Sequence, residues 1–148
     1  MMVHLVRLAF RLSIVWAWIV RPVTIGVRIV LLQEDKVLLV RHTYMDGWHC
    51  PGGSLKRKET PLEGAVREAK EEVGAEPLET PELVGIISQH NDIRSDHVVT
   101  YVCRNFKIGE ATDRWEIAER RFFAVDALPP DFRGVWPKLL RKLASERR

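Results

Sequence analysis

The chain has few cysteines and no apolar run long enough to cross a membrane. Its two cysteines, Cys50 and Cys103, share no CxxC spacing, which excludes a disulfide framework and fits a reducing, cytoplasmic setting. No cluster of cysteine and histidine accompanies either of them, so a structural zinc site is not favoured. The N-terminal apolar run, Leu12–Val20, has nine residues, far short of the roughly 20 that a spanning helix needs.

Strong charge of either sign is also missing. The formal net charge of the 148 residues is +3, with 29% charged and 46% hydrophobic residues. This composition is typical of one globular domain of ordinary size. The mildly basic balance suits an anionic small molecule, but it is too weak to indicate nucleic-acid binding. We therefore expect no nucleic-acid partner.

The first 21 residues are predicted to form a separate helical segment ahead of a domain at residues 22–148. Apolar residues recur at helical spacing, and Arg7 and Arg11 lie one turn apart; the apolar positions are Leu5, Leu8, Leu12, Trp16 and Ile19. Three interpretations are open. The helix packs on its own domain or on the partner of a homodimer, residues 4–20 make peripheral contact with a membrane surface through tryptophans and arginines, or the segment is a cleaved signal.

The rest of the chain mixes strands and helices. Residues 23–32 and 36–42 are rich in valine, isoleucine and leucine and flank a polar turn, which predicts a hairpin. Two strands are expected at 83–89 and 97–107 around a polar loop at 91–96. A short strand at 121–125 and a last helix at about 135–145 follow. Because this order lacks regular βαβ alternation, it predicts an α+β fold of the α/β/α sandwich type.

One helix is marked at both ends. Thr60 is placed as the N-cap, Pro61 occupies the first helical position, and Glu63 completes a capping box. Gly74 is placed to end the helix. Within it, Glu68, Glu71 and Glu72 have the spacing i, i+3 and i+4, which puts three like charges on one face. A solvated acidic surface explains this spacing as well as a Mg²⁺ site does, although carboxylate oxygens are ligands that Mg²⁺ prefers.

The surroundings of these glutamates resemble the Nudix hydrolase family. Residues 53–75, GSLKRKETPLEGAVREAKEEVGA, match the Nudix box at every defined position. The resemblance implies the Nudix fold, with a mixed β-sheet between helices, plus the extra N-terminal helix. It also implies Mg²⁺-dependent hydrolysis of a diphosphate bond in a nucleoside diphosphate derivative or a nucleoside triphosphate, with Mn²⁺ as an alternative ion.

The resemblance also assigns roles to residues. Glu68, Glu71 and Glu72 match the metal-binding glutamates, and the carbonyl of Gly52 matches a further metal ligand. Glu68 or a neighbouring carboxylate deprotonates the attacking water. Arg67 matches an orienting arginine that pairs with Glu59, which places both in the catalytic set. Independently, Gly52 and Gly53 permit the backbone to approach a phosphate or an ion closely.

Outside the box the candidates are weaker. Glu116 is the best positional match to a further acidic metal ligand, with Glu119 second, and a solvated loop charge is an equal alternative for each. Arg41 is a candidate phosphate ligand, and Tyr44 and Trp48 are candidates to stack on a base. A surface ion pair for Arg41 and core packing for the two aromatic residues are the alternatives.

The identity of the substrate does not follow from the sequence. The sequence lacks the coenzyme A signature, the proline of many ADP-ribose enzymes and the tyrosine of diadenosine polyphosphate hydrolases. Asn91 stands near the place where that proline or tyrosine would be expected. A small-molecule nucleotide derivative is the expected partner. The competing function is a Nudix domain that acts as a nucleotide-binding or membrane-associated regulatory module without turnover. Cys50 is expected to be a packing residue rather than a nucleophile.

Overall fold

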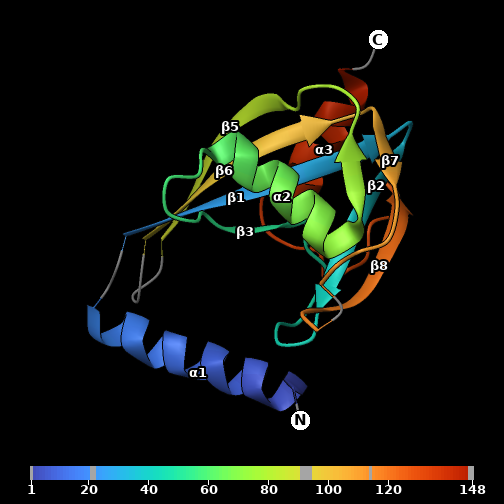
Figure 1. The fold of residues 1–148 in the computed structure, drawn as a ribbon. Coiled ribbons are helices and arrows are strands. Elements are labelled where there is room, and N and C mark those ends of the chain that lie inside the picture. Colours follow the sequence, from blue (N-terminus) through green and yellow to red (C-terminus); the bar gives the residue numbers. More distant parts are fainter. Residues whose placement is uncertain (1, 21–22, 91–94, 114, 147–148) are drawn as a thin grey trace.

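The computed structural model describes residues 2–20, 23–90, 95–113 and 115–146. In this part of the chain there are three helices and eight strands (Figure 1). In chain order they are α1 (Met2–Val20), β1 (Val23–Gln33), β2 (Lys36–His42), β3 (Gly52–Ser54), α2 (Pro61–Val73), β4 (Ala75–Pro77), β5 (Glu82–His90), β6 (Ser95–Cys103), β7 (Phe106–Ile108), β8 (Ile117–Ala124) and α3 (Trp136–Ser145).

The central sheet is mixed, with the order β5-β6-β1-β2-β8. β1 runs parallel to β6 along most of its length, and the other strand pairs are antiparallel. β2 pairs with β1 only beside the turn that joins them, where Leu32 lies opposite Val37 and Gln33 lies opposite Lys36. The other half of β1 pairs instead with β3, where Arg28 lies opposite Gly52. The sheet therefore opens between β1 and β2, and the glycine-rich segment, residues 51–53, lies in this opening.

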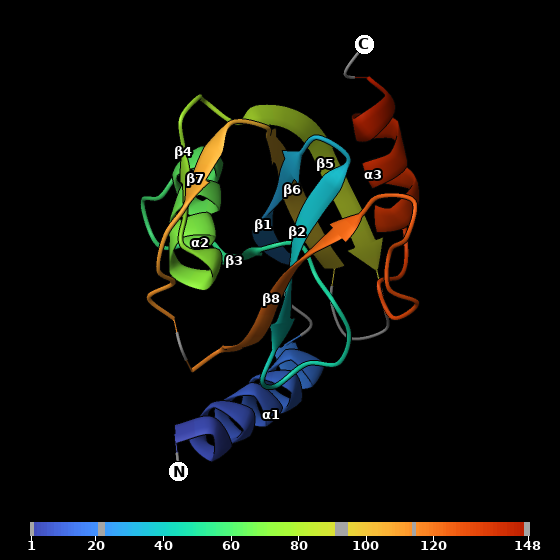
Figure 2. The ribbon, with the colours of Figure 1, turned by 90° about the vertical axis from the view of Figure 1, so that its right-hand side faces the viewer.

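The two faces of the sheet carry separate hydrophobic cores. Successive side chains of a strand point to opposite faces, and β1 accordingly sends Val27, Ile29 and Leu31 toward α2 and Val30 and Leu32 toward α3. Figure 2 shows α2 and α3 on opposite sides of the sheet. This three-layer arrangement confirms the predicted α/β/α sandwich.

The predicted caps of α2 are confirmed. The Thr60 hydroxyl accepts a hydrogen bond from the backbone N–H of Glu63, and the Glu63 carboxylate accepts one from the N–H of Thr60. Gly74 ends the helix with φ 66°, a left-handed conformation that glycine adopts without strain. A Cβ at Gly74 would also lie 2.5 Å from the carbonyl oxygen of Gly109. The caps therefore set where α2 begins and ends, and its apolar residues Ala65, Ala69 and Val73 face the sheet.

The predicted hairpin and the N-terminal and C-terminal helices are confirmed, but the single strand expected at 97–107 is wrong. The chain bends at Arg104 and Asn105, whose backbone N–H groups both donate to Oε1 of Glu79, and it continues as the separate strand β7. The short strands β3 and β4 were not predicted. Of the loop expected at 91–96, residues 91–94 lie outside the described residues, as do residues 1, 21 and 22 of the predicted segment boundary.

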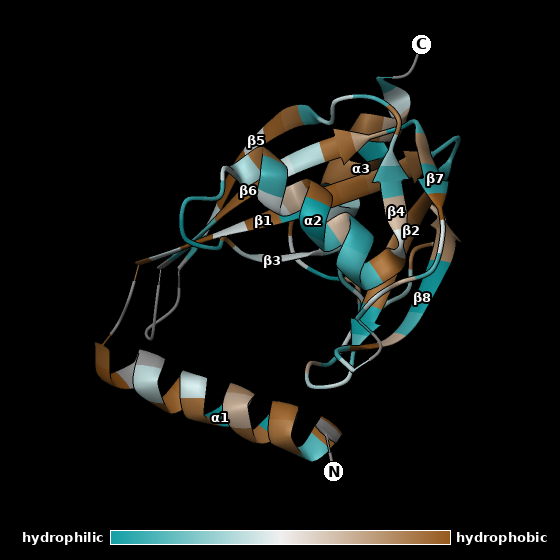
Figure 3. Ribbon diagram, in the orientation of Figure 1, coloured by the Kyte–Doolittle hydropathy of each residue, from teal (hydrophilic) through white to brown (hydrophobic). Residues whose placement is uncertain are grey.

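α1 lies beyond one end of the sandwich rather than within its layers (Figures 1 and 2). Apolar residues dominate its ribbon in Figure 3. No helix among the described residues has the length and apolar character needed to cross a membrane.

Candidate active site

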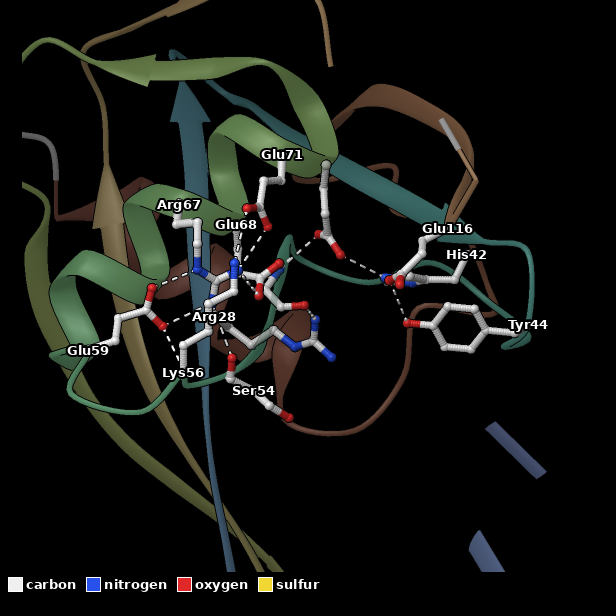
Figure 4. A network of polar contacts seen from close by, with 12 residues as sticks. Arg28, His42, Tyr44, Ser54, Lys56, Glu59, Arg67, Glu68, Glu71 and Glu116 are labelled. Carbon is white, nitrogen blue, oxygen red and sulfur yellow. Dashed lines mark hydrogen bonds and ion pairs between the residues drawn. The ribbon is translucent and has the colours of Figure 1, made fainter. Parts of the chain in front are cut away.

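Arg67 organises the carboxylates on one face of α2. Its Nε and Nη2 donate to the two carboxylate oxygens of Glu59 at 2.6 and 3.0 Å. Its Nη1 donates to Glu68 at 2.7 Å and to Glu71 at 2.9 Å. Figure 4 shows this guanidinium between the three acids. The predicted pairing of Arg67 with Glu59 is therefore present, and it is bidentate, the strong geometry for such pairs.

Glu72 is buried, with 4% of its surface exposed, and both of its oxygens have partners. Oε2 accepts a hydrogen bond from the backbone N–H of Gly52 at 2.9 Å. Oε1 lies 2.9 Å from Nε2 of His42, which is also buried. Nδ1 of His42 has no hydrogen-bond partner among the described residues. Sequence reasoning gave His42 no role, because its pairing with Glu72 arises only when β2 packs beside α2.

The glycine segment approaches both β1 and α2 closely. A Cβ at Gly52 would lie 2.1 Å from the carbonyl oxygen of Val27, and one at Gly53 would lie 2.7 Å from Oε1 of Glu68. Arg28 holds the segment from β1, since its Nη1 donates to the carbonyl oxygens of Cys50 at 3.1 Å and Gly52 at 2.8 Å. Sequence reasoning missed Arg28. The available signal was an arginine inside the apolar strand sequence of residues 23–32.

Glu116 approaches the same region from another loop. Its backbone carbonyl accepts a hydrogen bond from the N–H of Thr43 at 2.8 Å, and its Oε2 lies 3.5 Å from the hydroxyl of Tyr44. Burial raises the pKa of the Glu116 carboxyl, and the negative charges of Asp113 and Glu72 raise it further. Glu116 therefore joins Glu68, Glu71 and Glu72 in one group of carboxylates, here called the acidic cluster. Glu119, the second choice, pairs instead with Arg121.

Electrostatics divide the glutamates into two kinds. Hydrogen bonds from Arg67 and from the backbone of Lys56 lower the pKa of Glu59 to about 2. Burial raises the pKa of Glu68 despite its hydrogen bond from Arg67, and the nearby charges of Glu72 and Glu71 also raise it. Carboxylates whose pKa values are raised by mutual repulsion and burial form a site where positive charge is stabilising.

The donor set suits a hard divalent cation by its chemistry, because it consists of carboxylate and carbonyl oxygens. As the side chains stand, no group of three or more His, Cys, Asp and Glu residues in the described ranges is arranged to hold a metal ion. Glu68 and Glu71 are bonded to Arg67, and the carbonyl of Gly52 is bonded to Arg28. Arg67 uses only one oxygen of each carboxylate, and an ionised carboxylate offers about four acceptor positions, so a cation can bind these glutamates while Arg67 still orients them.

The structure revises one of the candidates for substrate contact, Trp48, and gives partners to a second, Arg41. Trp48 is only 4% exposed and stacks edge-on against Phe123 with ring centroids 4.7 Å apart. Its faces are not open to a base, so the packing alternative holds for Trp48. Arg41 lies over the Trp48 ring at 4.7 Å and 3.9 Å from Asp131, as the ion-pair alternative expected. Its side chain is 44% exposed and also lines a cavity, so this pair does not exclude contact with a substrate. Tyr44 is partly exposed beside Glu116, and the rings of Phe10 and His42 lie 5.0 and 5.2 Å from its own.

Cys50 is fully packed, as expected. It is 2% exposed, and burial raises the pKa of its thiol to about 12. A thiol in this state is protonated at neutral pH and is a poor nucleophile.

A cavity of about 760 Å³ lies beside the acidic cluster, between α1 and the loop that follows β2. His42 and Tyr44, which touch Glu72 and Glu116, form part of its wall. Arg7 and Arg11 come from α1, and Arg41 comes from β2. Asp46 and Asp131 also line it, so its wall has three arginines against two carboxylates. A volume of this size is within the range of small-molecule sites, and the excess of positive charge suits an anionic ligand.

Comparison with known proteins gives a family match and related folds. The family model described as NUDIX domain matches residues 22–143. A human diphosphoinositol polyphosphate phosphohydrolase is 39% identical over 85 residues, which are 57% of this chain and 44% of that protein. An RNA pyrophosphohydrolase of Xanthomonas campestris is 45% identical over 61 residues, which are 40% of this chain and 29% of that protein. The chain thus spans less than half the length of either relative.

Solved structures are similar in fold. The MutT NUDIX hydrolase of Burkholderia pseudomallei superimposes with a TM-score of 0.73 at 19% identity, over 82% of this chain and 98% of that one. The residues matched by the family model include every strand of the sheet and α2, while α1 lies outside the match.

Proposed function

Because the chain belongs to the Nudix family, we propose that it hydrolyses a diphosphate bond with the help of Mg²⁺ held by Glu68, Glu71 and Glu72. The substrate proposed is a nucleoside diphosphate derivative or a nucleoside triphosphate, and Mn²⁺ is expected to replace Mg²⁺. Two curated relatives that match part of the chain are named as phosphohydrolases acting on phosphorylated substrates, which supports this reaction class.

One observation carries the proposal. Two carboxylates of α2, those of Glu72 and Glu68, lie against the backbone of Gly52 and Gly53. Glu71 shares Arg67 with Glu68, and a fourth carboxylate, Glu116, approaches from a separate loop. Such a gathering of negative charge disfavours the ionised state of its members, and a divalent cation removes that penalty. A solvated acidic surface would not bury Glu72 or bring Glu116 toward it.

The residues have distinct tasks in the proposed reaction. When bound, Mg²⁺ supplies neutralisation of the diphosphate charge and polarisation of a phosphorus–oxygen bond. Arg67, held by Glu59, orients Glu68 and Glu71. Arg28 fixes the carbonyl of Gly52 and the approach of Gly53 to the substrate. Glu68 or Glu116, whose pKa values are raised, accepts the proton of the attacking water.

The remainder of the substrate is proposed to occupy the cavity beside Tyr44. Arg41 contributes positive charge there, and Tyr44 offers a ring face for a base or another planar group. Neither residue belongs to the Nudix box, which is why the box leaves the substrate unspecified.

The test is a screen of nucleotide derivatives and diphosphate esters with Mg²⁺, in which products are identified by chromatography and phosphate release. On the best substrate we expect Glu71→Gln and Glu72→Gln each to lose at least about a hundredfold in rate, the scale on which loss of a positioned charge acts in catalysis. Glu76→Gln, an exposed glutamate on β4, is the control and should keep the wild-type rate. If Glu71→Gln and Glu72→Gln both kept the wild-type rate, the claim that these glutamates hold the metal ion would be wrong.

The alternative is a nucleotide-binding or membrane-associated regulatory module without turnover. It requires that the wild type bind a nucleotide, measured by calorimetry, yet hydrolyse no member of the screen. The complete box argues for turnover, because a binding module has no use for a water-activating carboxylate.

A further inference from the structure

α1 contacts the domain through one of its faces. Nε of Arg7 donates to the carbonyl oxygen of Thr43 at 3.0 Å. The ring of Phe10 lies 5.0 Å from that of Tyr44. Arg7 and Phe10, with Arg11 and Ile14, also line the cavity next to the acidic cluster. These four positions have the spacing i, i+3, i+4 and i+7, which places them on one side of a helix.

The other side of α1 forms an apolar strip, here called the outer stripe. Its members are large apolar residues at helical spacing, with 54–71% of each exposed: Leu5, Leu8, Leu12, Val15, Trp16 and Ile19. None of the six is polar or charged. The exposure continues past the helix, where Val23 is 71% and Ile25 is 55% exposed.

An apolar strip of this length is not stable in water alone. Monomeric proteins rarely expose large contiguous apolar patches, and such patches mark contacts with a protein or a membrane. A helix that is apolar on nearly all sides is normally buried. The rest of the domain does not bury the outer stripe, because the buried residues of its two hydrophobic clusters include none from α1. The outer stripe therefore needs an occupant from outside the described chain.

The charges of the N-terminal residues indicate what kind of partner covers the outer stripe. The first acidic residue of the sequence is Glu34, so residues 1–33 contain four arginines and no carboxylate. Arg11 lies three residues after Leu8 and four before Val15, and it therefore borders the outer stripe. Two copies of α1 packed through their outer stripes would bring their arginines together without a carboxylate from either helix. A layer of anionic lipid headgroups neutralises them.

We propose that α1 is an interfacial helix that lies in the plane of an anionic membrane surface. The outer stripe enters the boundary between headgroups and acyl chains, Arg11 contacts the headgroups, and Trp16 occupies the interfacial layer that its amphipathic ring favours. The opposite face of α1 holds the loop of Thr43 and Tyr44. The cavity beside the acidic cluster is thereby kept next to the lipid surface. This placement is independent of the reaction that the carboxylates perform.

The test is sedimentation of the full-length protein with vesicles of phosphatidylcholine alone and with vesicles of phosphatidylcholine and phosphatidylglycerol in equal parts. We expect the wild type to sediment with the mixed vesicles and to show a blue shift of tryptophan emission. The double variant Leu12→Gln/Trp16→Gln should lose roughly tenfold or more in partitioning, because it removes two large apolar groups from the stripe. Arg11→Gln, which leaves the stripe intact, should weaken binding to mixed vesicles selectively.

The matched control is Leu83→Gln/Ile86→Gln, which changes two apolar residues of β5 that are 63% and 66% exposed. It should bind vesicles as the wild type does, and circular dichroism should show that all variants keep their helix content. Wild-type protein that stays in the supernatant with both vesicle types overturns the proposal. So does equal sedimentation of the wild type and the stripe variant. A dimer in light scattering that the stripe variant dissociates, without vesicle binding, assigns the stripe to a second copy instead.

Discussion

Glu59 is the residue whose charge the site stabilises most clearly. Its pKa falls from an ordinary 4.5 to about 2, chiefly through hydrogen bonds from Arg67. A lowered pKa in the folded state means that the ionised carboxylate stabilises the fold. This contribution is complete above pH 4.5 and is lost as the pH falls toward 2.

We therefore expect Glu59→Gln to lower the free energy of unfolding at neutral pH, and the difference from the wild type to shrink as the pH falls from about 4.5 to about 2. Urea denaturation at a series of pH values measures this. Glu76→Gln serves as the control at an exposed position. A difference between wild type and Glu59→Gln that stays constant over this range would contradict the assigned pairing.

The sequence was most informative for residues whose roles depend on local spacing. Helix spacing put Glu68, Glu71 and Glu72 on one face, and the resemblance of residues 53–75 to the Nudix box gave them roles together with Arg67 and Glu59. The partners that come from distant strands were not identifiable in this way. His42 meets Glu72 only after β2 packs near α2, and Arg28 meets Gly52 only through the pairing of β1 with β3.

At the scale of elements, the capping box stabilises the first turn of α2, the helix that carries the carboxylates. Thr60→Ala removes the hydroxyl that accepts the N–H of Glu63, and loss of such a cap costs about 1 kcal/mol, within a range of roughly 0.5–2. We expect a drop of this size in the free energy of unfolding, measured by urea titration. Thr80→Ala, at an exposed position outside the helix, should leave stability unchanged. Equal effects of the two substitutions would argue against the capping box.

The elements themselves were predictable where their signals are local and strong. Caps defined α2, and β-branched runs around a polar turn defined the hairpin of β1 and β2. β3 was not predictable because its three residues include Gly52 and Gly53, which carry no strand preference. The break between β6 and β7 depends on Glu79, some 25 residues earlier in the chain, so the local pattern from 97 to 107 gives no sign of it.

At the scale of the whole molecule, the order of elements predicted the layered fold, but not the parallel pairing of β1 with β6. That pairing joins residues about 70 positions apart, such as Val27 and Val99, and no local pattern specifies it. The placement of α1 was likewise left open between its own domain, a partner and a membrane. Its few contacts with the domain explain why helical periodicity alone could not decide.

The same contacts lead to a prediction for the domain boundary. Between the described residues of α1 and the domain there are one hydrogen bond and one ring contact, which together stabilise the fold by about 2 kcal/mol. Residues 22–148 should therefore unfold cooperatively, with a free energy within that margin of the full chain. Calorimetry measures this, and a broad, non-cooperative transition would show that α1 is an integral part of the fold.

The most direct measurement of the central claim is the rate of diphosphate hydrolysis as a function of Mg²⁺ concentration, for wild type and Glu71→Gln, on the best substrate of the screen. We expect no activity after chelation, saturable recovery when Mg²⁺ is added to the wild type, and a rate at least about a hundredfold lower for the variant even at high Mg²⁺. Activity that persists in chelator, or a variant that reaches the wild-type rate, would contradict the claim that these carboxylates hold the ion that hydrolysis needs.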